Sequence, residues 1–467
     1  MKISRMAVLG TLVILTTGCA ALSEDRGFGP VEQITAETLD KEVRWVRSDA
    51  ERDEVDARIA ELLAAPLSAD SAVQIALLNN RSLQAGFEAL GITEAERVQA
   101  GRLSNPGFTF GKTRRGSERE IERGFHFNLA QLFFLPTINK MESRRLARVQ
   151  QDVALQVLDL ASQTRKAWIE AVSTQESALY MRKVLDVADV SADLARRMLT
   201  IGNFSKLQQA REQSAYADAA VNLARAENAA LAARERLTRL LALYGDSASY
   251  RLPDRLPLLP EEPGQYPDAV KAALAQRLDV QAARINVEQQ AQNLGMVRTN
   301  RFINVLEVGT VYNSSNEEPR QTGWEIGFEL PLFDWGGTKV ARADGIYRQA
   351  MNEAAQTAIE ARSEVRQAYA GYRSAYDIAR HYQDEIVPLH QRISEENQYR
   401  YNGMIIGVFE LLADVRSQIG TVLGYIQARQ DYWLAQADLD MAMIGKPGLV
   451  AMSTATAGGD SNNAGDH

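Results

Sequence analysis

Residues 324–337 read WEIGFELPLFDWGG, and this stretch decides the fold. From position 324 to position 330, large apolar residues alternate with acidic residues and glycine. Alternation with a period of two predicts a β-strand with one apolar and one polar face. Such a strand suits a barrel wall with lipid outside and water inside, so we expect Glu325 and Glu329 to line the lumen. Gly336 and Gly337 predict a turn into a helix, because glycine adopts conformations that other residues avoid.

A similar pattern occurs in the first half of the chain. Phe108 and Phe110 belong to one alternating run, and Phe125 and Phe127 belong to the next. Each half therefore predicts an antiparallel hairpin, which gives four strands per chain. We expect the polar turns at Arg114 to Glu122 and at Asn313 to Gln321.

The two halves are copies of one another. TRKAW at 164–168 is similar to VRQAY at 365–369, and FNL at 127–129 is similar to FEL at 328–330, both at an offset of 201. Five prolines within 253–267 separate the copies and indicate a linker. We expect a signal peptide (1–18), an N-terminal anchor segment (19–64), a first repeat (65–244), a Pro-rich linker (245–267), a second repeat (268–446) and a disordered tail (447–467).

Helices of unusual length follow both hairpins. They are predicted from Thr137 to about Ile201 and from Gly337 to about Tyr401, roughly 100 Å each at 1.5 Å per residue. Each ends at a glycine, and a second helix of about 40 residues returns. Pro388, inside the second long helix, predicts a kink.

A shorter helix is expected ahead of the first hairpin. Ser68 can cap its N-terminus, and its apolar periodicity continues to about Leu103. Pro106 follows and prevents the helix from continuing.

The N-terminus has the features of a secretory signal. Lys2 and Arg5 precede an apolar run, and small residues follow up to Cys19, the only cysteine of the chain. The run resembles the bacterial lipoprotein box, in which this cysteine is lipidated. The residue after the cysteine is Ala20 rather than Asp, which in lipoproteins generally resembles the signal for sorting to the outer membrane.

Composition excludes several classes of protein. A membrane-spanning helix needs roughly 20 consecutive apolar residues. Outside the N-terminus, the chain of 467 residues has no such segment, which excludes an inner-membrane transporter. The net charge of −8 gives no basic stripe for nucleic acid. His381 and His390 lack metal-ligand spacing, and we find no catalytic set, so neither an enzyme nor a cofactor or metal site is expected.

The order helix, hairpin, long helix, turn, helix, given twice, resembles the TolC family of outer-membrane efflux channels. The segment 327–337, the helix starts at Arg81 and Arg277, and the glycines at the far turns carry the resemblance, which covers about residues 65–446. It implies a mainly α protein with a small β part: a homotrimer with a twelve-stranded barrel in outer-membrane lipid and an α-helical tunnel in the periplasm. Cys19 places the resemblance in the lipidated branch of the family.

The resemblance also implies partners. The far turns of the helices would face a periplasmic adaptor protein, itself joined to an inner-membrane pump. Exposed apolar side chains there would be contacts with the adaptor. The residues expected in this role are Gly202, Asn203, Phe204, Gly403, Met404 and Ile405.

Glu410 and Asp414 follow the second far turn, one helical turn apart. On a threefold axis each would form a ring of three carboxylates, which favours cations in a pore. A constriction of the channel and an ordinary solvated helix face are both open at this point.

The sequence thus predicts a passive exit duct in a tripartite efflux system, for metal ions or drugs. The alternative is a structural or adhesive lipoprotein of long helices without transport. The amphipathic hairpins favour the duct, because a scaffold does not need them.

Overall fold

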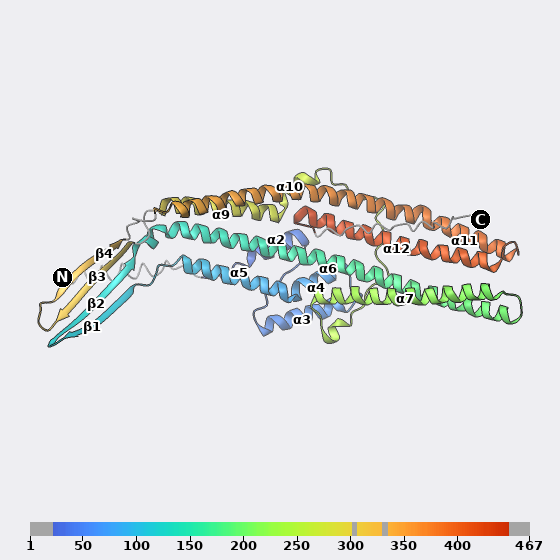
Figure 1. The fold of residues 1–467 in the computed structure, drawn as a ribbon, viewed down its shortest axis with the longest axis horizontal. Coiled ribbons are helices and arrows are strands. Elements are labelled where there is room, and N and C mark those ends of the chain that lie inside the picture. Colours follow the sequence, from blue (N-terminus) through green and yellow to red (C-terminus); the bar gives the residue numbers. More distant parts are fainter. Residues whose placement is uncertain (1–21, 301–305, 329–334, 448–467) are drawn as a thin grey trace, which may run out of the picture. The chain divides into compact units, whose positions relative to one another are not determined.

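The computed structural model describes residues 22–300, 306–328 and 335–447. The chain is mainly helical, with one antiparallel sheet (Figure 1). It forms two compact units. The first consists of the residues up to Val55, Leu77–Leu158 and Ala272–Arg362. The second consists of Asp56–Ala76, Asp159–Lys271 and the residues from Ser363 onward. A bilayer-crossing helix needs both length and a continuous apolar stretch, and no helix among the described residues combines the two.

The elements occur in the same order in both halves, as predicted for a duplication. After α2 (Gly29–Leu39) and α3 (Asp49–Leu63), the first half contains α4 (Ala69–Asn79), α5 (Arg81–Ala100), β1 (Gly107–Arg115), β2 (Glu118–Asn128), α6 (Leu129–Thr200) and α7 (Lys206–Leu241). The second half contains α8 (Ala269–Gln276), α9 (Leu278–Asn300), β3 (Leu306–Ser315), β4 (Gln321–Phe328), α10 (Gly337–His381), the π-helical turn η3 (Tyr382–Ile386), α11 (Val387–Asn402) and α12 (Val408–Ile444).

Three predicted boundaries of the first half are wrong. The helix from Ser68 is two helices, because Asn80 accepts hydrogen bonds from the N–H groups of Ser82 and Leu83 and caps a new helix. The hairpin turn is only residues 116–117, since the charged residues around it continue the strands. Helix α6 begins at Leu129 and contains Pro136, which costs the helix one backbone hydrogen bond rather than delaying its start.

The first unit contains the sheet and the helical segments next to it. The strands follow the order β1-β2-β3-β4, and every pair is antiparallel. Ion pairs join the neighbouring helices α6 and α9 (Arg144 to Glu288, 3.1 Å) and α9 and α10 (Arg298 to Asp344, 3.6 Å).

The N-terminal segment packs within the first unit. Phe28 lies edge-on to Phe87 of α5, with ring centroids 4.9 Å apart. The indole N–H of Trp45 donates to Glu88 at 3.0 Å. These contacts fix the chain ahead of α5 by aromatic burial and hydrogen bonding.

The second unit contains α7, α11, α12 and the adjoining parts of α6 and α10. Its linker has only a short 3₁₀ turn, η2 (Gly245–Ala248), yet side chains fix its backbone. The Trp433 indole donates to the Pro257 carbonyl at 3.2 Å, and the Tyr376 hydroxyl donates to the Glu261 carbonyl at 2.7 Å. The Pro-rich segment is therefore ordered by hydrogen bonds from helices rather than by its own secondary structure.

The position at which a kink is predicted, Pro388, coincides with an irregularity of the long helix. The turn η3 widens the helix directly before it, and Pro388 occupies the first turn of α11. Proline lacks the N–H that the preceding turn would need, so the widened turn absorbs the mismatch. A side chain on Gly424 of α12 would lie 2.8 Å from the Tyr382 hydroxyl, which explains the glycine where this turn packs.

Candidate functional site

The sheet has two faces of different chemistry. Residues at alternate positions of a strand, and their partners across the ladder, share a face. One side, the aromatic face, consists of Phe108, Phe110, Lys112, Arg114, Arg119, Ile121, Arg123, Phe125, Phe127, Val308, Thr310, Tyr312, Ser314, Thr322, Trp324 and Ile326. Each of its phenylalanines, Trp324 and Ile326 is more than half exposed. A row of exposed aromatic and aliphatic side chains needs an apolar environment.

The opposite side, the acidic face, is polar. Its charged residues are Arg115, Glu118, Glu120, Glu122, Glu307 and Glu325, with His126 also present. Five carboxylates against one guanidinium give a formal charge of −4 per chain. Glu325 lies against Gly309 of β3, where a side chain would meet its carboxylate at 2.7 Å. The acidic face therefore concentrates negative charge on β2, β3 and β4, whereas β1 contributes only Arg115 to it.

The helical hairpins end in two turns of the same type. At the first, the N–H of Gly202 donates to Leu199 O and that of Asn203 to Met198 O, with Gly202 at φ +80°. This paired arrangement is the Schellman cap. Ser205 then caps α7 in a reciprocal capping box with Gln208.

The second turn repeats the cap, but not at the predicted glycine. The N–H of Met404 donates to Tyr401 O at 2.9 Å and that of Ile405 to Arg400 O at 2.8 Å. Met404 has φ +59°, whereas Gly403 has φ −77°. The structural counterpart of Gly202 is therefore Met404, at an offset of 202 rather than 201.

The exposure of the second turn agrees with the prediction, whereas that of the first turn differs from it. Met404 is 93% exposed and Ile405 69%, as an apolar contact surface requires. Phe204 is only partly exposed. Ile201, which the sequence reasoning did not single out, is 71% exposed and supplies the apolar group of the first turn.

The two predicted carboxylates of α12 lie in different environments. Glu410 is exposed, while Asp414 is only 9% exposed and its Oδ2 lacks a hydrogen-bond partner among the described residues. Sharing one side of a helix has therefore not given them the same surroundings.

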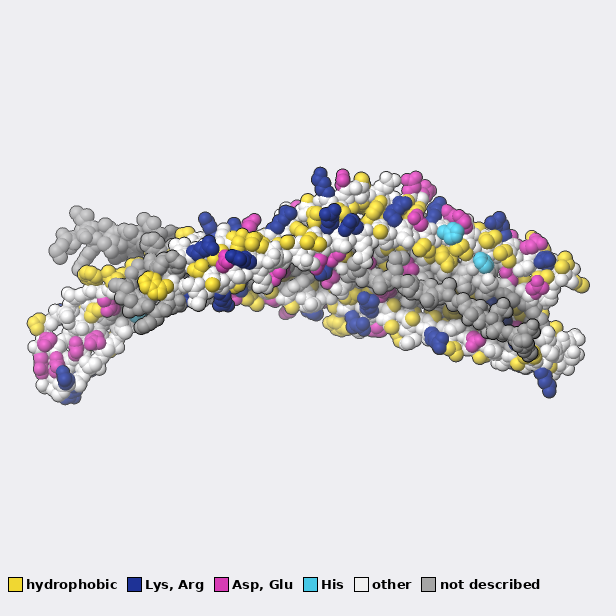
Figure 2. All heavy atoms as spheres, turned by 45° about the horizontal axis from the view of Figure 1, so that its top comes forward, with side chains coloured by type: hydrophobic (Ala, Val, Ile, Leu, Met, Phe, Trp, Pro, Cys, Tyr) yellow, Lys and Arg dark blue, Asp and Glu magenta, His cyan; other side chains and the backbone are white. Residues whose placement is uncertain are grey.

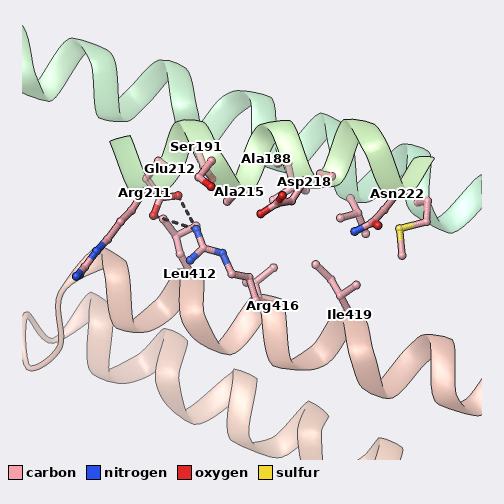
Figure 3. Close-up of a pocket in the computed structure, with 16 residues that line it drawn as sticks. Ala188, Ser191, Arg211, Glu212, Ala215, Asp218, Asn222, Leu412, Arg416 and Ile419 are labelled. Atoms are coloured by element: carbon pink, nitrogen blue, oxygen red, sulfur yellow. Dashed lines mark hydrogen bonds and ion pairs between the residues drawn. The ribbon is translucent and has the colours of Figure 1, made fainter. Parts of the chain in front are cut away.

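A groove of about 450 Å³ lies beside them, between α12 and the hairpin of α6 and α7 (Figure 3). Leu412 and Ile419 line its α12 side, and Ala215 lies across from them on α7. Arg416 reaches across and donates to both carboxylate oxygens of Glu212 at 3.0 and 2.8 Å. Both bonds come from the same Arg416 nitrogen, Nη2, and Glu212 is 3% exposed, so the pair is a charge-assisted link between α7 and α12.

The faces of the sheet and the two capped hairpins can be compared with known proteins. Residues 269–443 match the family described as Outer membrane efflux protein. The matched region runs from the start of α8 almost to the end of α12, and it includes β3, β4 and the second hairpin turn.

A curated relative has a related sequence. The Cobalt-zinc-cadmium resistance protein CzcC of Cupriavidus metallidurans is 22% identical over 281 residues. The alignment covers 58% of this chain and 64% of that protein, so the chain spans less than two thirds of its length.

Solved structures of outer-membrane and channel proteins share the fold. The outer membrane protein VceC of Vibrio cholerae aligns over 81% of this chain and 96% of its own, with a TM-score of 0.68 and 15% identity. The CmeC outer membrane channel of Campylobacter jejuni aligns over 88% and 91%, with a TM-score of 0.67 and 15% identity. CusC, whose structures concern transmembrane channel formation, aligns over 81% and 92%, with a TM-score of 0.66 and 16% identity.

The sequence reasoning found part of the charge that the sheet carries. It selected Glu325 and Glu329, and Glu329 lies outside the described residues, as does Cys19. It missed Glu118, Glu120 and Glu122 because they were assigned to a turn. The available signal was the strict alternation of acidic residues with arginine and isoleucine from 118 to 123.

Proposed function

We propose that this chain is one subunit of an outer-membrane efflux channel, a passive exit duct from the periplasm to the exterior. The observation that carries the proposal is the sheet with an exposed aromatic face and an acidic face, attached to duplicated capped helical hairpins. An apolar outer face and a polar inner face are what a barrel wall in lipid requires. The family match of the second half and the fold of the solved channels agree with it. The role is transport rather than catalysis.

The edges of the sheet support assembly of several copies, which we propose to be a homotrimer. Among the described strands, β1 and β4 each pair on one side only. An unpaired edge is costly in lipid, because its N–H and C=O groups find no water. Pairing β4 of one copy with β1 of the next closes after three copies, with four strands from each. The helical hairpins of the copies would form the periplasmic tunnel.

The hairpin turns are proposed to contact a periplasmic adaptor, which joins the duct to an inner-membrane pump. Exposed Ile201, Met404 and Ile405 support this role. Replacing Met404 and Ile405 by Ser should weaken capture of the adaptor, because both contribute apolar area. Leu258→Ser, at a 75% exposed linker position, is the control and should leave capture unchanged.

Cys19 is proposed to carry a lipid anchor that supplements the barrel. Acyl chains add membrane affinity without the permanence of a spanning structure. Cys19→Ala behind a standard cleavable signal should therefore still give outer-membrane trimers. A soluble periplasmic product would contradict the barrel.

Cations are the proposed class of exported substrate, as metal ions or as cationic drugs. The charge of the acidic face supports it, because polar groups of a lumen tune selectivity. The resistance named for the relative CzcC, to cobalt, zinc and cadmium, agrees with the metal-ion form.

The mature chain in mild detergent is the first test. Mass photometry should show a trimer, and planar bilayers should show channels of uniform conductance. A structural or adhesive lipoprotein would give neither a closed trimer nor conductance. A monodisperse monomer would overturn the proposal.

A further inference from the structure

Basic residues gather at one end of the aromatic face. Its residues form cross-strand rows, and successive rows lie about 7 Å apart because two residues separate them along a strand. Near the helices, Phe108, Phe125 and Trp324 share one row. At the other end, Arg114 pairs with Arg119 beside the hairpin turn.

The change from aromatic to basic occurs within two rows. Phe110 pairs with Arg123, and Arg123 lies 5.8 Å from the ring centroid of Tyr312 on the next strand. Lys112 pairs with Ile121 in the following row. Figure 2 shows mainly Asp and Glu side chains, with some Lys or Arg at the tip, over the end of the sheet that carries the turns.

Four cations of the aromatic face have no acidic partner among the described residues. Lys112, Arg114, Arg119 and Arg123 are all exposed, and none forms an ion pair with a described residue. Arg114 donates from Nε to the carbonyl of Gly116 at 3.1 Å. The aromatic face carries four positive charges and no described acidic residue, while the five carboxylates of the strands lie on the opposite face.

This separation of charge has a consequence in a membrane. Uncompensated Arg and Lys on the lipid face of a barrel destabilise it, by an amount that falls towards the interface. Long basic side chains reach the headgroup level with their charged ends. Anionic lipid headgroups there would attract them, while water alone would not explain why all four lie on the aromatic face.

We propose that the basic rows bind the phosphate groups of anionic lipid headgroups in the leaflet at the turn end of the sheet. The inference rests on the proposed barrel. Guanidinium groups suit phosphate because they donate in a planar fork. The surface would select negatively charged over zwitterionic lipid around each subunit.

Trp324 provides the measurement, because it is 75% exposed on the same face. The full-length trimer is placed in vesicles that contain brominated phosphatidylcholine or brominated phosphatidylglycerol. Its Trp324 signal is obtained as the difference from a Trp324→Phe variant. Quenching by phosphatidylglycerol should exceed quenching by phosphatidylcholine, with a relative association about threefold higher, falling as salt is raised.

The variant with Lys112, Arg114, Arg119 and Arg123 all replaced by Gln should lose this preference. Arg115→Gln is the matched control, since Arg115 neighbours Arg114 on the same strand but lies on the acidic face. It should keep the preference. Equal quenching by the two lipids in the unaltered protein, or the same preference in the fourfold variant, would overturn the lipid site.

The proposed barrel fails in a different way. If neither lipid quenches Trp324, the aromatic face does not contact a bilayer, and the proposed barrel would then be wrong as well. Binding of inorganic phosphate to the basic rows without any preference for phosphatidylglycerol would assign the rows to free phosphate and overturn the lipid proposal.

Discussion

The equivalent residues of the two hairpin turns differ in the cost of their backbone conformation. Gly202 has φ +80° and Met404 has φ +59° at the same position of a Schellman cap. The left-handed region costs a residue with a Cβ about 1–2 kcal/mol of conformational free energy, and it costs glycine little. The second turn therefore carries strain that the first avoids, at its most exposed apolar side chain.

Exchanging these residue types should act in opposite directions. Gly202→Ala should destabilise the first turn by about 1 kcal/mol, and Met404→Gly should stabilise the second by a smaller amount because glycine loses more entropy on folding. Hydrogen exchange of peptides covering each turn measures both effects. Faster exchange of the second turn in Met404→Gly would show that the methionine side chain stabilises it by contacts.

A buried tyrosine cluster should make the second unit sensitive to alkali. Tyr432 is 2% exposed, with ring centroids 5.6 Å from Tyr372 and 5.8 Å from Tyr376. Burial, and then the Tyr372 hydroxyl, raise the pKa of Tyr432 well above its ordinary value. An unfolded tyrosine titrates near pH 10. The folded state therefore holds its proton longer, and this stabilisation is complete below about pH 10 and is lost as the pH rises towards the folded pKa.

Tyr432→Phe should flatten the fall in thermal stability above pH 10, because the residue that loses a proton on unfolding is removed. Melting temperatures between pH 8 and about pH 11.5 measure the slope. Tyr244→Phe is the control at an 80% exposed position and should leave the slope unchanged. An identical slope in Tyr432→Phe would mean that other groups cause the alkaline sensitivity.

Among the elements, α6 and α12 are joined by a buried ion pair. Lys166 donates to Asp438, and their side chains are only 8% and 9% exposed. Removing one partner leaves a buried charge, which costs about 3–5 kcal/mol, whereas replacing both by apolar residues is often close to neutral. Lys166→Met should thus destabilise strongly, and adding Asp438→Leu should restore most of the loss. Denaturant titration of both variants measures this, and equal loss in the two would contradict it.

Strands and helices were predicted where the pattern is local. The alternation around Phe125 and Trp324 gave both hairpins, and apolar periodicity gave the long helices. The turn at 116–117 was predicted too long, because charged residues read as a turn when both faces of a strand are polar at that end. The start of α6 was predicted too late, because the helix begins at Leu129 and continues through Pro136 despite the backbone hydrogen bond that the proline removes.

Contacts between distant segments could not be predicted. Lys166 and Asp438 are 272 positions apart, and Glu212 and Arg416 are 204 apart. Nothing in the local sequence of either residue specifies its partner. The left-handed residue of the second turn, Met404, was missed for a different reason. Glycine is the residue that most often takes this conformation, so the sequence indicated the adjacent Gly403, one residue too early.

For the whole molecule, the charge on the acidic face should set ion selectivity. Replacing Glu118, Glu120 and Glu122 by Gln removes three negative charges per chain, nine in a trimer, while nearly preserving shape. If this face lines the lumen, fewer carboxylates attract fewer cations. Reversal potentials in a salt gradient should then move towards zero, and the trimer should persist.

Two further variants locate the charge that controls selectivity. Arg114→Gln with Arg119→Gln alters the aromatic face of the same strands, so it should leave the reversal potential unchanged. Glu410→Gln tests the proposed constriction on α12. If the exposed Glu410 carboxylates form a threefold ring, removing them should lower cation selectivity on its own, because three charges in a narrow pore act together. Selectivity that is insensitive to Glu410 but sensitive to the strand carboxylates would place the selective region in the barrel, and would return Glu410 to a solvated helix face.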